Sequence, residues 1–104
     1  MKSIDRMKEH IRDEIKDARE YIREALACKE ECPDDADMYR ELAEEELRHM
    51  EKLHSAVVRK IKKYREETGK EPPPDMQAKY DVLHELFTKD ANDVRMMIRM
   101  YKEA

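Results

Sequence analysis

Apolar residues recur along the chain in steps of three and four, the spacing that places side chains on one face of an α-helix. In the N-terminal part they form a heptad seam whose members, with one exception, are apolar, aromatic or thiol side chains: Ile4, Met7, Ile11, Glu14, Ala18, Tyr21, Ala25 and Cys28. The exception is Glu14, while Ile15 and Ile22 widen the apolar stripe on one side. The pattern predicts an amphipathic helix over residues 3–31, with Ser3 as its N-cap.

Two neighbouring seams run through the middle of the chain and predict a second helix over residues 34–68. The first is apolar except for a histidine: Ala43, Leu47, Met50, His54, Val57, Ile61 and Tyr64. We interpret His54 as a core or rim residue. The second seam places Glu46 and His49 between apolar positions: Tyr39, Leu42, Glu46, His49, Leu53, Ala56 and Lys60. Glu46 and His49 are three positions apart, so they share one helix face.

Proline and glycine divide the chain into three helices. The residue before Pro33 is pushed out of the helical region, so the first helix must end there. Gly69 fits a left-handed cap at the end of the second helix. Residues 70–74 contain three prolines and form a stiff linker. We therefore expect one all-α domain over residues 1–104, built from a long antiparallel hairpin and a third helix.

The third helix is expected over residues 75–103, with Asp75 as its N-cap. Its seam contains mostly apolar residues: Met76, Tyr80, Leu83, Phe87, Asp90, Val94, Met97 and Tyr101. A break or kink is expected at residues 88–93, because Asp90 followed by Asp93 resembles a new helix start. We interpret Asp90 as a cap.

Polar residues inside the apolar seams indicate a candidate metal site. We expect Glu14 on the first helix to face Glu46 and His49 on the second. An ionised carboxylate in an apolar seam is costly unless it is paired or binds a metal. Carboxylate and imidazole ligands suit iron, manganese or zinc. A second reading stays open: with 26 acidic residues, some fall on a seam by chance, and Glu14 could pair with a Lys or Arg whose stem lies along the seam.

Other candidate donors give weaker signals. Asp81 and His84 repeat the carboxylate-x-x-His spacing but flank their seam, which favours a surface or rim pair over a second ligand pair. Cys28 and Cys32 lie one helical turn apart near the hairpin turn. Two thiols alone make an incomplete metal site, so free thiols are the favoured interpretation.

Composition narrows the class of protein. The 104 residues are 46% charged, yet Lys and Arg alternate with Asp and Glu and the net charge is −4. The charge forms no overall basic field, so we do not expect nucleic-acid binding. The sequence has no apolar run of about 18 residues, so we expect no membrane-spanning helix. The N-terminus lacks the apolar region of a signal peptide. Two cysteines make no disulfide framework, so we expect a cytoplasmic protein.

Residues 38–49 (MYRELAEEELRH) resemble the second helix of rubrerythrins, and Glu14 and Tyr21 resemble the pattern of their first helix. In that family a Glu-x-x-His follows the first ligand by a little over thirty residues, and here Glu14 and Glu46 are 32 apart. The chain is also similar to encapsulated ferritins, which are short and carry one Glu and one Glu-x-x-His. The resemblance covers about residues 4–55.

The resemblance implies a ferritin-like di-iron protein that oxidises ferrous iron or reduces a peroxide, with Glu46 bridging two metals and Glu14 and His49 as terminal ligands. The second hairpin of rubrerythrins and their paired Cys-x-x-Cys motifs are missing here. The resemblance therefore implies a homodimer, or a larger oligomer built from dimers, that completes a four-helix bundle. The alternatives are a metal-free helical assembly or adaptor protein that keeps this architecture, and a structural zinc or calcium site without redox activity.

Overall fold

The computed structural model describes residues 2–103, and in this part of the chain every regular element is helical. The prediction of an all-α protein is confirmed. The elements, in chain order, are α1 (Lys2–Cys28), α2 (Pro33–Thr68), α3 (Pro74–Glu85), the π-helical turn η1 (Leu86–Asp90) and α4 (Ala91–Glu103).

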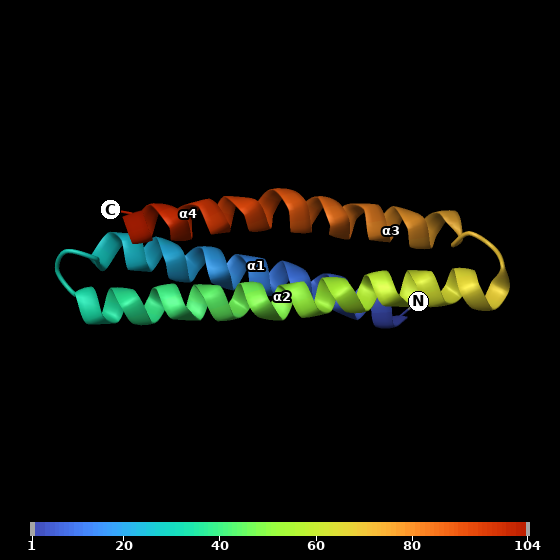
Figure 1. Ribbon diagram of the computed structural model, residues 1–104, viewed down its shortest axis with the longest axis horizontal. Coiled ribbons are helices and arrows are strands. Elements are labelled where there is room, and N and C mark those ends of the chain that lie inside the picture. The colour runs from blue at the N-terminus through green and yellow to red at the C-terminus, as the bar shows by residue number, and fades with distance from the viewer. Residues whose placement is uncertain (1, 104) are drawn as a thin grey trace.

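Three helical rods lie side by side along the length of the molecule (Figure 1). The first is α1, the second is α2, which runs antiparallel to α1, and the third is the continuous run of α3, η1 and α4, which runs parallel to α1. The extents are 57 × 18 × 17 Å. A helix of 36 residues, the size of α2, is about 54 Å long, so this one helix determines the length of the molecule.

The turn between α1 and α2 is short because proline dictates it. α1 ends at Cys28, earlier than the predicted residue 31. Cys32 has φ −134° and ψ 66°, outside the helical region, as expected before proline. Pro33 then occupies the first turn of α2, where its missing N–H costs nothing.

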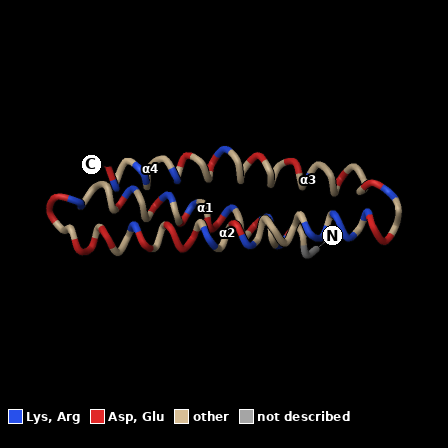
Figure 2. Tube along the Cα trace, viewed as in Figure 1, with Lys and Arg blue, Asp and Glu red and all other residues tan. Residues whose placement is uncertain are grey.

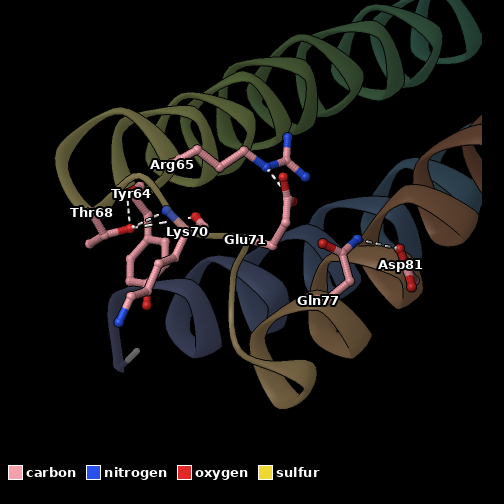
Figure 3. Close-up of polar contacts among 7 residues, drawn as sticks. All are labelled: Tyr64, Arg65, Thr68, Lys70, Glu71, Gln77 and Asp81. Atoms are coloured by element: carbon pink, nitrogen blue, oxygen red, sulfur yellow. Dashed lines mark hydrogen bonds and ion pairs between the residues drawn. The ribbon is translucent and has the colours of Figure 1, made fainter.

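The turn after α2 has the predicted glycine cap. Gly69 has φ 65° and ψ 13°, and its N–H donates to the carbonyl of Arg65 at 2.9 Å. The Thr68 hydroxyl accepts the N–H of Lys70 at 3.2 Å, and Arg65 Nε donates to Glu71 Oε2 at 2.9 Å (Figure 3). These contacts lead the chain out of α2 and towards α3.

Two predicted helix caps are wrong. Ser3 and Asp75 both lie inside helices, because α1 includes Lys2 and α3 begins at Pro74. Pro73 occupies the N-cap position of α3, and no side chain caps that end. Proline supplies a fixed backbone angle, and the N-cap therefore lies two residues before the predicted Asp75.

The core contains side chains from all three rods: Ile4, Ile11, Ile15, Ala18, Ile22 and Ala25 of α1; Ala36, Ala43, Leu47, Met50, Val57 and Ile61 of α2; and Met76, Leu83, Ala91, Val94, Ile98 and Tyr101 of the third rod. On α1 the buried stripe includes Ile15 and Ile22, while Glu14 and Tyr21 are only half-buried. The third rod packs on the Ile15 side, so Glu14 lies at the margin of the core.

A π-helical turn replaces the predicted break in the third helix. Glu85 (φ −63°, ψ −46°) and Ala91 (φ −67°, ψ −37°) both keep helical angles, so the rod is continuous and Asp90 caps nothing. A π turn is one residue wider than an α turn. The buried positions therefore move from the expected Asp90 and Met97 to Ala91 and Ile98.

Polar contacts attach the end of α4 to the hairpin. The buried Tyr101 donates its hydroxyl to Asp37 Oδ1 at 2.6 Å, and Lys29 Nζ donates to the Tyr101 carbonyl. The hydrogen bond to Asp37, together with burial, raises the pKa of Tyr101 to about 12. Lys102 Nζ lies 2.8 Å from Glu44 Oε1 on α2.

Charges of both signs are interleaved along all three rods (Figure 2). Such interleaving is typical of solvated helix faces. Among the described residues, no helix combines the length and the apolarity needed to cross a membrane.

Two adjacent valines of α2 test the assignment of the core. Val57 is fully buried and Val58 is 39% exposed. We expect Val57→Ala to lower the free energy of unfolding by about 2 kcal/mol, through two lost methyl groups and the remaining cavity. Val58→Ala is the matched control and should cost less than about 0.5 kcal/mol. Urea denaturation measures both, and equal losses would contradict the assignment of the core.

Candidate metal centre

Three predicted donors converge at the middle of the hairpin. Glu14 comes from α1, and Glu46 and His49 come from adjacent turns of α2. One ligand atom from each lies within 4.8 Å of the others. His49 Nδ1 is 3.6 Å from Glu14 Oε2 and 3.9 Å from Glu46 Oε2. In the part of the chain that the structure describes, no other group of three such donors is this close.

The antiparallel register of the hairpin explains this convergence. Tyr21 of α1 stacks on Tyr39 of α2, with ring centroids 6.3 Å apart. Glu14 precedes Tyr21 by one heptad, and Glu46 follows Tyr39 by one heptad. Two antiparallel helices that meet at the tyrosines must therefore meet again at the two glutamates.

The environment of Glu14 is unfavourable for a carboxylate without a cation. The side chains of Glu14 and Glu46 are 24% and 19% exposed. Glu14 Oε2 is shielded from solvent, and within the described residues it has no hydrogen-bond partner, because 3.6 Å to His49 Nδ1 is too long. Across residues 4–103 neither carboxylate forms an ion pair with Lys or Arg. Two half-buried, adjacent carboxylates repel each other unless a cation joins them.

The spacing of the donor atoms fits a shared cation. Two ligands that bind one ion at about 2.1 Å lie roughly 3.0–3.5 Å apart. The distances of 3.6 Å and 3.9 Å from His49 Nδ1 to the two carboxylates are slightly larger, so small side-chain rotations suffice. Two carboxylates and an imidazole suit iron, manganese or zinc. One chain supplies only three ligand residues, so further ligands must come from water, substrate or a second chain.

The donors lie within a band of half-buried apolar side chains. We call this band, together with the donors, the hairpin face: Met7, Glu14 and Tyr21 of α1, and Tyr39, Leu42, Glu46, His49, Leu53 and Ala56 of α2. Its apolar members are half-buried, whereas the neighbouring seam of α2, which includes Met50 and Val57, is buried under the other rods. The hairpin face therefore borders the core without being covered by the third rod.

The weaker candidate pair takes other partners. Asp81 accepts a hydrogen bond from Gln77 Nε2 at 3.0 Å (Figure 3). His84 lies against the rings of Tyr80 and His54, with centroids 6.0 Å and 5.9 Å away. Both Asp81 and His84 are exposed. Within the described part of the chain they belong to no cluster of three metal-binding donors.

His54 belongs to an aromatic cluster that the spacing of the sequence did not indicate. Its ring stacks on Phe87 at 4.0 Å between centroids, and its Nε2 is shielded without a partner among the described residues. Burial lowers the pKa of His54, and the charge of His84 lowers it further. The expected core or rim histidine is half-buried, and the π turn supplies its main neighbour.

No protein-family model, curated protein or solved structure matches this chain. The candidate site is therefore supported by the chain's own geometry, and the resemblance to rubrerythrins stays a prediction.

Removing one carboxylate from the metal-free protein tests the unpaired state of Glu14. We expect Glu14→Gln to leave the free energy of unfolding unchanged or to raise it by about 1 kcal/mol at pH 8, because it relieves repulsion from Glu46. Asp17→Asn, an exposed change of the same kind on α1, is the control. A loss of 1 kcal/mol or more in chelator-treated Glu14→Gln would show that Glu14 is a structural ion-pair partner.

The lowered pKa of His54 predicts a pH-dependent stability. Its folded-state pKa lies below the unfolded value of about 6.5, so unfolding takes up a proton at intermediate pH. The contribution of His54 is complete above that value and is lost as the pH falls through the folded-state pKa. His54→Phe should remove this part of the loss of stability at low pH, whereas His10→Gln at an exposed position should not. Melting temperatures from pH 8 to pH 5 measure it, and parallel curves for His54→Phe and the unchanged protein would contradict it.

Proposed function

We propose that two copies of this chain join through their hairpin faces into a ferritin-like four-helix bundle that binds two metal ions. Glu14, Glu46 and His49 of each copy would hold them. The observation that carries this proposal is the shielded, unpartnered Oε2 atom of Glu14, with a second carboxylate and an imidazole within 4.8 Å.

Ligand number and charge support a pair of chains. Each copy brings two carboxylates, so a pair brings four, whose charge two divalent cations neutralise. Each copy also leaves half-buried apolar side chains such as Leu42 and Leu53 around the donors, which a second hairpin face would cover. A two-fold symmetric dimer buries the same patch on both subunits and is the commonest oligomer.

Iron is the metal we favour, with manganese or zinc as alternatives. Bound iron would supply oxidation–reduction chemistry, with ferrous iron or a peroxide as the substrate class. The chain would contribute negative charge through Glu14 and Glu46 and a neutral nitrogen through His49. The stacked rings of Tyr21 and Tyr39 would limit the access of water from one side. We place this activity in the cytoplasm, where thiols stay reduced.

One observation favours a second candidate function, a metal-free assembly or adaptor protein. A protonated His49 would form ion pairs with both carboxylates at the observed 3.6 Å and 3.9 Å. The hairpin face would then be a protein interface only, and chelators would leave the melting temperature unchanged. A structural zinc or calcium site would instead bind metal without oxidising ferrous iron.

Metal loading separates these functions. With ferrous iron and oxygen, the protein should develop the near-ultraviolet absorption of ferric iron bound to carboxylates, and elemental analysis should find about one ion per chain. Glu46→Ala should weaken binding by more than about 100-fold, because loss of a direct ligand exceeds loss of a supporting contact.

The matched control is Glu45→Ala, which removes an exposed carboxylate from the neighbouring position and should retain full loading. If Glu46→Ala also retains full metal content, the assignment of the site is wrong. Zinc or calcium in the purified protein, without absorption after iron addition, would support the structural-site alternative.

A further inference from the structure

Two cysteines flank the hairpin turn at a separation that a disulfide can span. Cys28 is the last residue of α1, and Cys32 directly precedes Pro33. The N–H of Cys32 donates to the carbonyl of Cys28 at 2.8 Å, which closes a turn of the α-helical size. Such a turn places the two Cα atoms about 6 Å apart, inside the range of about 4.4–6.8 Å found across disulfides.

The two thiols differ in exposure. Both cysteines are free, Cys28 is half-buried and Cys32 is exposed. Burial raises the pKa of Cys28, and the neighbouring Cys32, Glu24 and Asp35 raise it further. Cys32 is therefore the more available nucleophile.

We propose that Cys28 and Cys32 form a reversible dithiol–disulfide site that exchanges with low-molecular-weight disulfides. The Cys32 thiolate attacks one sulfur of a disulfide such as oxidised glutathione, forms a mixed disulfide and releases one thiol. The Cys28 thiolate then attacks Sγ of Cys32, forms the Cys28–Cys32 bond and releases the second thiol. The two cysteines lose two electrons and two protons, and the small disulfide gains these electrons and protons and becomes two thiols.

The site lies beside the contacts that attach α4 to the hairpin. Lys29, the residue after Cys28, donates from Nζ to the Tyr101 carbonyl, and its Nζ lies 4.5 Å from the centroid of the Tyr101 ring. A change in the turn upon oxidation would therefore alter the contact between Lys29 and Tyr101 at the end of the third rod. Glu14 lies 14 residues away along α1, roughly 21 Å, so this site does not depend on the proposed metal centre.

Exchange with oxidised glutathione tests the proposal on the full chain. After incubation, free thiols are blocked with N-ethylmaleimide and intact masses are measured. The unchanged protein should lose about 2 Da, the mass of two hydrogens, and take up no blocking group. Dithiothreitol should restore both thiols. Cys28→Ser should accumulate one glutathione on Cys32, and Cys32→Ser should react at Cys28 at least tenfold more slowly.

Three outcomes would overturn the proposal. The first is an unchanged protein that keeps one or two glutathiones without forming the internal bond. The second is a disulfide-linked dimer, and the third is equal reaction rates of Cys28→Ser and Cys32→Ser. Circular dichroism of both variants verifies that they are helical before exchange is measured.

Discussion

Packing of α1 against α2 determines which residues of the two helices lie opposite each other. The proposed site depends on that register. Pro33 ends the turn abruptly, and the stacked rings of Tyr21 and Tyr39 mark the pairing. One heptad further along, the same pairing brings Glu14 opposite Glu46. A slip of one residue would rotate each side chain by about 100° around its helix and separate the donors.

The third rod decides which side of the hairpin is core. It covers the stripe that includes Ile15 and Ile22, and it leaves Glu14 and Glu46 half-buried and His49 exposed. This position gives the carboxylates a local environment of low polarity without full burial, so they stay available to a cation. The wide turn at Leu86–Asp90 keeps the rod in contact by bringing Ala91 into the core instead of Asp90.

Sequence periodicity predicted the parts of this molecule that depend on local physics. The helical class follows from apolar spacing, and the cap at Gly69 follows from its freedom at positive φ. The cap at Asp75 was wrong because prolines start α3 without help from a side chain, and Ser3 lies inside α1. The π turn, the margin position of Glu14 and the stacking of His54 on Phe87 depend on where the third rod packs, which no local pattern encodes.

The mass of the metal-loaded particle tests the central claim most directly. Each chain has a mass of 12.6 kDa, so native mass spectrometry resolves both the number of chains and the number of bound ions. A site shared across two hairpin faces predicts a particle of two chains that carries two ions and separates into single chains when the ions are removed. A single chain that retains its metal, or a pair of chains that stays together and binds no metal, would contradict this account.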